Sequence, residues 1–265
     1  MIRAVVIILI AALAGCASQK SGNPPAVANT PPPAERPLTP NSGLERAKIH
    51  TELAVSYYQN GQLEVALDEL KIATNADRTY APAYDALGLV YMQLKQDAPA
   101  EQSFRQSLKL NPNSSETKNN YGLFLCQRRR EAEGIKQLLD ALKNPLYATP
   151  DVAYKNAGVC ARKAGDDKTA EAYFVKSIAL NPRQAQALYG LADLHYAQND
   201  YVGAKQYIGR YFSAVENAGP DALWLGAKIS HKLVDRTAIA NYGMQLRRRY
   251  PSSTEAKAFA EGRFE

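Results

Sequence analysis

Small and large apolar residues recur along this chain with a period of about 34 residues from Leu44 onward. Each period holds one small residue, a second small residue twelve positions later, and a large apolar residue four positions after that. The first set is Ala54, Gly88, Gly122, Gly158, Ala192 and Gly226. The second set is Ala66, Ala100, Gly134, Ala170, Ala204 and Ala238, and the third is Leu70, Phe104, Leu138, Phe174, Ile208 and Tyr242. A period of this length indicates a repeated supersecondary unit rather than one globular core.

Each unit is predicted to be a pair of antiparallel helices. Apolar residues within the units fall at helical spacing, as at Tyr84, Leu87 and Tyr91. The small residues allow the two backbones to approach, and the large residue one turn later fills the space that remains. Turns are predicted at Asn60-Gly61 and over 164–166, and proline ends several of the second helices because it cannot continue them.

This pattern resembles the tetratricopeptide repeat. We place six units, which start near Ala47, Ala81, Ser115, Asp151, Ala185 and Gly219. The resemblance implies an all-α fold, a right-handed superhelical solenoid of about six repeats over residues 42–265. In such an array each unit packs on its neighbours and the first helices line a concave face.

The first 15 residues are predicted to be a signal peptide. Arg3 supplies a positive charge, and the apolar run over 4–14 is too short to span a bilayer as a mature helix. Leu13-Ala14-Gly15-Cys16 resembles the bacterial lipobox, which implies cleavage before Cys16 and lipidation of its thiol. The alternative is an ordinary signal peptide with an unrelated cysteine.

Two features after the cleavage site bear on where the protein is held. The residue after Cys16 is Ala17. In enterobacterial lipoproteins, an Asp at this position would cause retention in the inner membrane. The resemblance therefore implies anchoring in the outer membrane, facing the periplasm. Residues 16–41 are predicted to be a lipidated, disordered tether, because seven of the 24 residues over 17–40 are proline and favour extended polyproline II conformation.

An apolar strip on the first helices of units one and two is the predicted partner-binding groove. The second, fifth, ninth and twelfth residues of each unit are expected to face the concave side. In the first two units these positions include Val55, Tyr58, Asp85, Leu89 and Met92. An exposed apolar strip in a groove is typical of a peptide or helix site, although these side chains could instead pack against the tether or Leu44. In units three and four the corresponding surface is polar and cationic, with Asn119, Lys155 and Arg162.

Cys126 and Cys160 lie at nearly equivalent places in the first helices of consecutive units. Because consecutive first helices are neighbours and the implied compartment is oxidising, the pair is predicted to form a disulfide. Their equivalence is off by two residues, so two buried free thiols are the alternative if the Cα atoms lie more than about 7 Å apart.

The sequence carries no recognisable catalytic constellation. His50, His195 and His231 are far apart and match no metal-ligand spacing, and no nucleophile elbow or phosphate-binding glycine loop is present. The net charge is +6, or +5 without Arg3, and its excess is scattered. We therefore expect a monomeric, non-enzymatic protein with no cofactor, no small-molecule substrate and no nucleic-acid partner.

Three segments of the repeats match motifs of a known family: Asn119-Asn120-Tyr121-Gly122-x-Phe124-Leu125, Leu191-Ala192-Asp193-Leu194-x-Tyr196, and Tyr242-Gly243-x-Gln245-Leu246 followed by Tyr250-Pro251. Through these segments the chain resembles the type IV pilus biogenesis and stability lipoproteins, the pilotin family called PilF or PilW. This resemblance implies a protein that escorts the pilus secretin subunit, PilQ, to the outer membrane and promotes its multimerisation. A repeat lipoprotein of outer-membrane barrel assembly and a scaffold for cell-wall synthesis enzymes are the alternatives.

Overall fold

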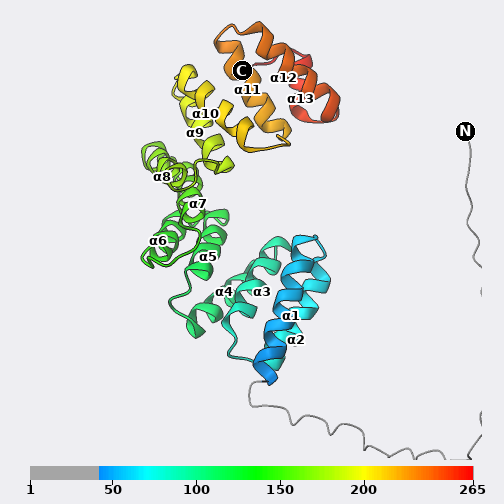
Figure 1. Ribbon diagram of the computed structural model, residues 1–265, viewed down its shortest axis with the longest axis vertical. Helices are drawn as coiled ribbons and strands as arrows, with labels where there is room; N and C mark the ends of the chain where they lie inside the picture. Colours follow the sequence, from blue (N-terminus) through cyan, green and yellow to red (C-terminus); the bar gives the residue numbers. More distant parts are fainter. Residues whose placement is uncertain (1–41, 265) are drawn as a thin grey trace, which may run out of the picture. The chain divides into compact units, whose positions relative to one another are not determined.

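The computed structural model describes residues 42–264, and within that range all regular structure is helical (Figure 1). The first six helices are α1 (Ser42–Gln59), α2 (Leu63–Ala76), α3 (Ala81–Gln93), α4 (Asp97–Leu110), α5 (Ser115–Gln127) and α6 (Glu131–Ala141). They are followed by α7 (Pro150–Lys163), α8 (Asp167–Leu180), α9 (Ala185–Ala197), α10 (Tyr201–Ala214), α11 (Pro220–Lys232), α12 (Arg236–Arg249) and α13 (Thr254–Ala260).

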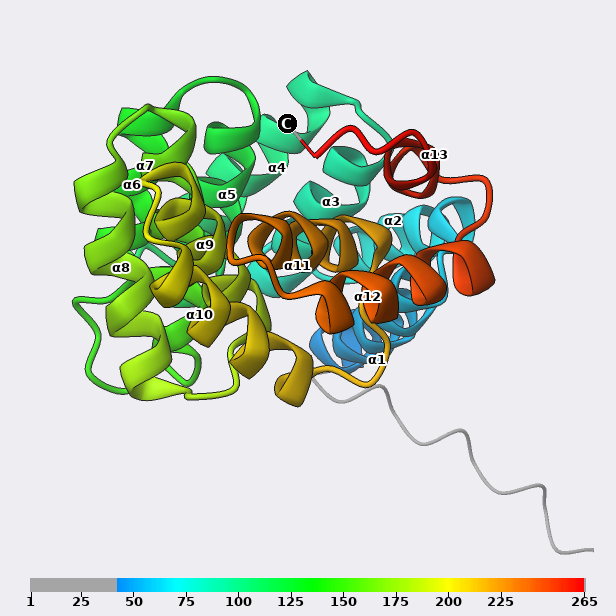
Figure 2. The same ribbon diagram turned by 90° about the horizontal axis from the view of Figure 1, so that it is seen from above.

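The helices pack as consecutive antiparallel pairs. Each odd-numbered helix from α1 to α11 contacts the even-numbered helix that follows it, and it also contacts the next odd-numbered helix (Figure 2). The predicted unit starts at Ala81, Ser115 and Ala185 are the first residues of α3, α5 and α9. This arrangement is the tetratricopeptide solenoid that the repeat pattern predicts, with the odd-numbered helices forming one layer.

Small residues sit where two helices of one pair come closest. A β-carbon added at Gly88 would lie 2.5 Å from the ring of Phe104, and one at Gly158 would lie 2.6 Å from the ring of Phe174. The large residues of the series are buried in the first five pairs: Leu70, Phe104, Leu138, Phe174 and Ile208 are at most 2% exposed. The predicted small-against-large packing is therefore the core of each unit, and only Tyr242 in the last pair remains half-buried.

The turn within each pair uses one residue of positive φ. These residues are Gly61, Lys95, Arg129, Gly165, Asn199 and Val234, with φ between 58° and 79°. Their spacing follows the period of the repeat, and the predicted turns at Asn60-Gly61 and 164–166 are confirmed. Glycine fits this left-handed conformation without strain, whereas a β-branched residue such as Val234 does not.

A short thirteenth helix, which the repeat pattern does not predict, covers the last pair. Its N-cap is Ser253, whose Oγ accepts a hydrogen bond of 3.0 Å from the backbone N–H of Ala256. Helix α13 packs on α11 and α12, and Phe264 behind it stacks on the ring of His231 at 4.4 Å. Repeat arrays need an end cap of this kind, because the last unit has no further neighbour to cover its apolar side.

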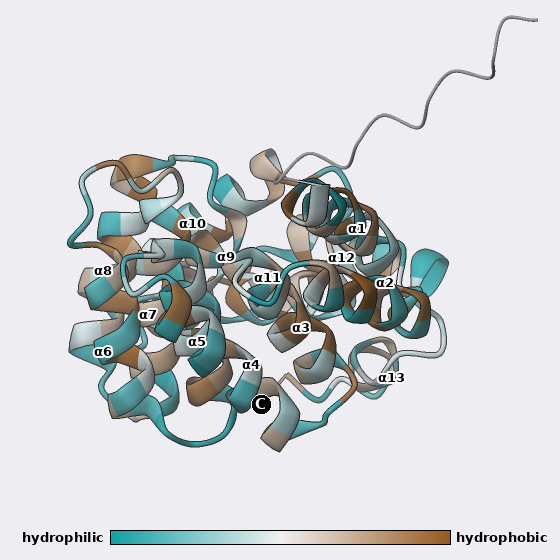
Figure 3. Cartoon of the chain, turned by 90° about the horizontal axis from the view of Figure 1, so that it is seen from below, coloured by the Kyte–Doolittle hydropathy of each residue, from teal (hydrophilic) through white to brown (hydrophobic). Residues whose placement is uncertain are grey.

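Apolar and polar residues alternate along the helices, as the hydropathy colours of Figure 3 show. Apolar turns are prominent on α2 and α3 in that view. Among residues 42–264 no helix is both long enough and apolar enough to cross a bilayer. The predicted signal peptide, Cys16 and the tether over 16–41 lie outside the described residues.

Candidate functional site

The predicted apolar strip on α1 and α3 is less exposed than expected. Val55 on α1 is 39% exposed, but Tyr58 is half-buried and packs against the cluster of Leu70 and Ala86. Burial also raises the pKa of the Tyr58 hydroxyl. At this end of the array, the exposed apolar surface of the strip is therefore mainly Val55.

Leu89 and Met92 on α3 are half-buried in a neighbouring core cluster. Both side chains pack against the group that contains Phe104, Phe124 and Leu125. Helix α5, which carries Phe124 and Leu125, lies directly beside α3 and covers this side of it. Tyr58, Leu89 and Met92 are therefore only partly exposed, because these side chains pack against the cores of their own and the next unit, and their contact with a partner stays a prediction.

The fifth predicted groove residue, Asp85 on α3, begins a chain of side-chain hydrogen bonds that crosses three first helices. Asn120 on α5 donates from Nδ2 to Asp85 Oδ2 at 3.0 Å, and Asn119 Nδ2 lies 3.3 Å from Asn120 Oδ1. Asn156 on α7 donates to Asn119 Oδ1 at 2.8 Å, and Lys155 Nζ donates to Asn156 Oδ1 at 2.7 Å. We call these five residues the polar ladder.

Burial shifts the pKa of the groups at both ends of the polar ladder. It raises the pKa of Asp85 to about 6, although Asn120 and Thr117 donate hydrogen bonds that oppose the rise. The Oδ1 atom of Asp85 is buried without a hydrogen-bond partner. At the other end, burial lowers the pKa of Lys155, and the carboxylate of Asp151 only partly offsets this effect. Titratable groups with shifted pKa values that lie on one face of a scaffold are typical of functional surfaces.

The polar ladder leads into a pocket of about 590 Å³ on the odd-numbered helices. Its lining comes mainly from α5, α7 and α9, with one residue each from α8, α10 and α11: Leu123, Gln127, Lys155, Asn156, Val159, Arg162, Lys163, Phe174, Gln186, Tyr189, Gly190, Asp193, Tyr211 and Asp221. Phe174 of α8 reaches the pocket between Gly158 and Gly190, because neither glycine has a side chain to cover its ring.

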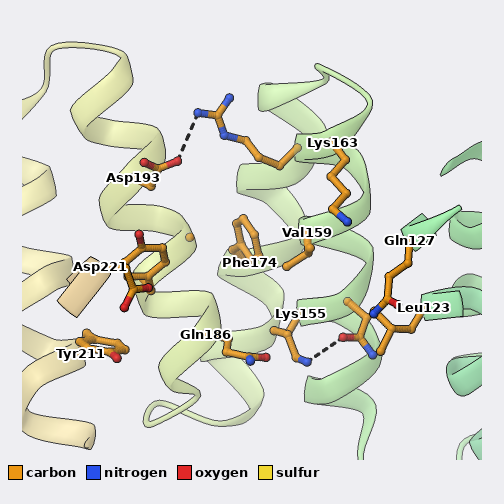
Figure 4. Close-up of a pocket in the computed structure, with 14 residues that line it drawn as sticks. Leu123, Gln127, Lys155, Val159, Lys163, Phe174, Gln186, Asp193, Tyr211 and Asp221 are labelled. Atoms are coloured by element: carbon orange, nitrogen blue, oxygen red, sulfur yellow. Dashed lines mark hydrogen bonds and ion pairs between the residues drawn. The ribbon is translucent and has the colours of Figure 1, made fainter. Parts of the chain in front are cut away.

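Charge is distributed unevenly around this pocket. Figure 4 shows Lys155 and Lys163 of α7 on one side and Asp193, Asp221 and Tyr211 on the other, with Phe174 and Val159 between them. Arg162 is already paired, with Asp167 at 2.7 Å and with Asp193 at 3.3 Å. Burial, together with the nearby carboxylates of Asp221 and Asp193, raises the pKa of Tyr189 to about 12, so its hydroxyl keeps its proton.

The concave-facing positions predicted from the sequence account for much of this lining. Leu123, Val159 and Asp193 occupy the ninth position of their units, Lys155 and Tyr189 the fifth. Applied to units three to five, the position rule therefore finds the pocket. The predicted groove falls on units one and two because their residues at these positions are more apolar.

Cys126 of α5 and Cys160 of α7 form a disulfide in the structure, with their Cα atoms 5.5 Å apart. Both residues are almost fully buried. The bond joins two neighbouring first helices just behind the polar ladder, and a β-carbon added at Gly134 would lie 2.5 Å from the sulfur of Cys126. Closing a loop of this length is worth about 3–4 kcal/mol in the chain-entropy estimate.

No group of three or more His, Cys, Asp or Glu side chains is placed to hold a metal ion in the part of the chain that the structure covers. His195 instead lies 2.7 Å from Asp200 through Nδ1 and packs on the ring of Tyr207 at 5.0 Å. The groups that line the pocket are those that bind peptides: amides, ammonium groups and apolar side chains.

Comparison with known proteins places this geometry in a family. Residues 81–114 and 156–211 each match a family model described as a tetratricopeptide repeat. The chain is 30% identical over 259 residues to the type IV pilus assembly protein PilF of Pseudomonas aeruginosa, which covers 97% of this chain and 96% of that protein. The chain belongs to the PilF/PilW family of type IV pilus biogenesis proteins.

Solved structures of this family share the fold. A crystal structure of PilW, described as a widely conserved type IV pilus biogenesis factor, has 34% sequence identity and a TM-score of 0.74, covering 81% of this chain and 98% of that one. The structure of Pseudomonas aeruginosa PilF has 30% identity and a TM-score of 0.74, covering 83% of this chain and 99% of that one. The resemblance to pilotins drawn from the sequence motifs is thus confirmed at the level of the family.

Proposed function

We propose that this PilF/PilW-family protein is an outer-membrane lipoprotein that binds the type IV pilus secretin subunit, PilQ. In this proposal the lipid on Cys16 holds the chain at the periplasmic face of the outer membrane, and the repeat array carries the secretin subunit there and promotes its multimerisation. Pilus formation and twitching motility depend on this step, and the protein itself makes or breaks no bond.

The observation that carries the proposal is the extent of the match to PilF. A similarity confined to the repeats would indicate only a common scaffold, since tetratricopeptide arrays serve many partners. Here the match extends over 97% of this chain and 96% of PilF, so it includes the sequence before the repeats as well. Resemblance to a pilus assembly protein over that length favours the pilotin role over other repeat lipoproteins.

The chemistry of a lipid anchor supports the same role. Each buried CH₂ group of an acyl chain contributes about 0.8 kcal/mol, so several chains on one cysteine hold a protein firmly at a membrane. The extended tether predicted for residues 17–40, at about 3.1 Å per residue, would give the array a reach of roughly 75 Å at most. A secretin subunit bound to the array would then stay close to the membrane in which it assembles.

Deletion of the gene tests the pilotin role. We expect heat-stable secretin multimers and surface pili to be lost from the outer-membrane fraction and restored by the wild-type gene. Complementation with Cys16→Ala should leave secretin multimers in the wrong membrane, because sorting and binding are separate tasks. Ala17→Asp keeps the cysteine but should retain the lipoprotein in the inner membrane, so it tests the sorting residue separately from the anchor. Normal multimers in the deletion strain would reject the proposal.

The contact on α1 needs a variant that does not disturb the core. Val55→Asp places a charge on a side chain that is already 39% exposed, so the fold should tolerate it. Val65→Asp on α2 is the matched control, since Val65 is 41% exposed and lies outside the predicted groove. Weaker secretin pull-down by Val55→Asp alone would support the predicted strip, and equal pull-down by both variants would exclude Val55 from the contact.

A further inference from the structure

Charge is sorted along the even-numbered helices, which form the other layer of the array. The side chains of α2, α4, α6, α8, α10 and α12 carry net charges of −2, 0, −2, 0, +2 and +4 in that order. Helices α10 and α12 contain no acidic residue. The positive charge of this layer is therefore concentrated at the C-terminal end of the array (Figure 1).

One side of α12 is not covered by other helices. Among residues 42–264, α12 contacts only α11 and α13, and its buried residues are Gly243 and Leu246. Four exposed residues recur at helical spacing on the opposite side of the helix. Together with the exposed Val234 in the turn before the helix, we call them the basic face: Arg236, Met244, Arg247 and Arg248.

The arginines of the basic face have no ionic partner in the described part of the chain. No carboxylate of residues 42–264 lies within ion-pair distance of Arg236, Arg247 or Arg248. A helix dipole favours cations in the last turn, which suits Arg247 and Arg248, but it disfavours a cation in the first turn, where Arg236 lies. Helix stability therefore does not account for the charge of the whole face.

The acidic groups around the basic face do not neutralise it. Asp235, the N-cap of α12, is already paired with Lys205 of α10 at 2.9 Å. Residues 236–263 hold six basic side chains and two acidic ones, Glu255 and Glu261, so this stretch carries +4 of the chain's net charge of +6. A surface of this kind attracts anionic partners.

Two large apolar side chains are exposed within the basic face. Val234 is 73% exposed and Met244 is 56% exposed. Val234 also has a φ of 58°, a left-handed conformation that is costly for a β-branched side chain, and its exposure leaves it little packing in return. Backbone strain of this kind clusters at functional sites, so we take Val234 as a contact residue for something outside the fold.

Arginines interspersed with exposed apolar side chains on one side of a helix fit the surface of a bilayer that contains anionic phospholipid. Lipid phosphates pair with guanidinium groups, and apolar side chains enter the boundary between headgroups and acyl chains. A soluble acidic protein would satisfy the charges but not the exposed apolar groups. The proposed anchor on Cys16, with a tether of roughly 75 Å at most, keeps such a bilayer within reach.

We propose that the basic face docks on a bilayer that contains anionic phospholipid. Arg236, Arg247 and Arg248 lie at the lipid phosphates, and Val234 and Met244 lie among the headgroups. The array is then held at both ends, by the tether before α1 and by α12, and the odd-numbered helices stay free for a partner. The inference goes beyond the proposed function, on which it rests only for the nearness of the membrane.

Vesicle binding by a chain without its lipid tests this assignment. The protein is the chain from residue 16 onward with Cys16→Ser, so no acyl chain can hold it on the vesicles. The vesicles are phosphatidylcholine, with or without one third of phosphatidylglycerol. Co-sedimentation at low salt should show binding to the anionic vesicles more than about tenfold tighter, because each cation near an anionic surface strengthens binding about fivefold.

A pair of charge variants locates the contact. Arg247→Gln with Arg248→Gln should weaken binding to the anionic vesicles about 25-fold, which is about fivefold for each charge. Arg46→Gln with Arg78→Gln is the matched control, because both arginines are exposed, lie in the first two units and remove the same charge. This control should bind nearly as tightly as the wild-type sequence.

A second pair tests entry into the bilayer. Met244→Ser should weaken binding about fivefold, because the serine gains nothing from leaving water. Val175→Ser, a change of a 43% exposed valine on α8, is the control and should bind normally. The far-ultraviolet circular dichroism of all the variants should match that of the wild-type sequence.

Three results would overturn the assignment. The first is equal binding to the two kinds of vesicle, and the second is unchanged binding by the folded Arg247→Gln and Arg248→Gln variant. The third is unchanged binding by Met244→Ser, which would mean that charge alone acts and would favour a soluble acidic protein as the partner. The vesicles carry neither a secretin nor the lipid of Cys16, so failure here leaves the proposed function intact.

Discussion

The repeat positions that face the concave side have different roles in two regions of the molecule: unit two, and units four and five. In unit two, Leu89 and Met92 at the ninth and twelfth positions are absorbed into the packing around Phe104 and Phe124. In units four and five, Val159 and Asp193 at the ninth position line a pocket, and Val159 also packs on the cluster around Phe174. The same place in a repeat can therefore serve only the packing between units or also border a pocket, depending on how large and how apolar its neighbours are.

This comparison also separates the core of a repeat from its surface. The small-against-large pairs are the same in both regions, with Gly88 against Phe104 and Gly158 against Phe174. The difference lies in the side chains at the concave-facing positions of the first helices, which lie over these pairs. Four predictions, taken from the largest expected effect to the smallest, test whether the regions share a core and differ only in those side chains.

Replacing the large core residue by alanine should lower the free energy of unfolding by the same amount in both regions. Phe104 and Phe174 occupy equivalent positions and are at most 2% exposed. We expect Phe104→Ala and Phe174→Ala each to lower the free energy of unfolding by about 3–5 kcal/mol, measured by denaturant titration. Phe→Leu variants at the two sites should lose less. A clearly smaller loss at Phe174 would mean that the pocket above it has loosened the core.

The disulfide joins α7 to α5, which packs against α3 and also contributes Leu123 and Gln127 to the pocket. The double variant Cys126→Ala with Cys160→Ala should be less stable by about 3–4 kcal/mol. Its unfolding curve should not respond to dithiothreitol, whereas that of the wild-type chain should shift toward that of the variant. If reductant left the wild-type curve unchanged, the bond would contribute nothing to stability.

Asp85 gives the packed region a pH dependence. Its pKa is raised from 3.8 to about 6 in the folded chain, so the folded state binds a proton that the unfolded state releases between these values. The stabilisation from this group is fully present below about pH 3.8 and is lost as the pH rises through about 6. Its total is on the order of 3 kcal/mol, at about 1.4 kcal/mol for each unit of pKa.

Asp85→Asn should remove this dependence. We expect the variant to gain about 1–2 kcal/mol of stability at pH 8 relative to the wild-type chain and little at pH 4, since the amide carries no charge to desolvate. Denaturant titrations at the two pH values give the comparison, and Asp68→Asn on the exposed face of α2 is the control. A wild-type slope that persists in Asp85→Asn would assign the dependence to another group.

The smallest effect concerns the turns, which follow one conformation in both regions. Val234 has a φ of 58°, a left-handed conformation that is costly for a β-branched side chain, whereas Gly61 adopts a φ of 75° freely. Val234→Gly should raise the free energy of unfolding by about 1 kcal/mol, and the reverse change Gly61→Val should lower it. A loss of stability in Val234→Gly would show that the valine side chain makes contacts that outweigh its strain.

Much of the fold followed from the sequence because the same packing contact recurs in each of six units, which makes its pattern easy to recognise. The small and large series identified the pairs that meet, and the glycines at 61 and 165 identified turns. Helix α13 was missed because it breaks the period and is shorter than a unit. Its signal was Ser253 at an N-cap position, followed by apolar residues that cover Trp224.

The candidate site was predicted only in part. The rule for concave-facing positions named Asp85, Asn119, Lys155 and Arg162, and these belong to the polar ladder or the pocket. Leu89 and Met92 were included in the predicted binding surface because that stretch is the most apolar, but in the structure both side chains are half-buried. Apolar residues occur both in buried cores and in binding surfaces. Apolar character alone therefore could not distinguish a side chain that packs against α5 from one that faces solvent.

The sequence by itself determined the repeat, the helix pairs, the residues that fill each pair and the family. Those properties depend on local spacing and on contacts about 16 residues apart, such as Gly88 with Phe104, which any unit makes alone. Only the tertiary structure decided which concave positions remain open and that Asn119, Asn120 and Asn156 connect Asp85 to Lys155. These features arise where three or four units meet, so they depend on side-chain sizes and charges summed over residues 34 or more positions apart.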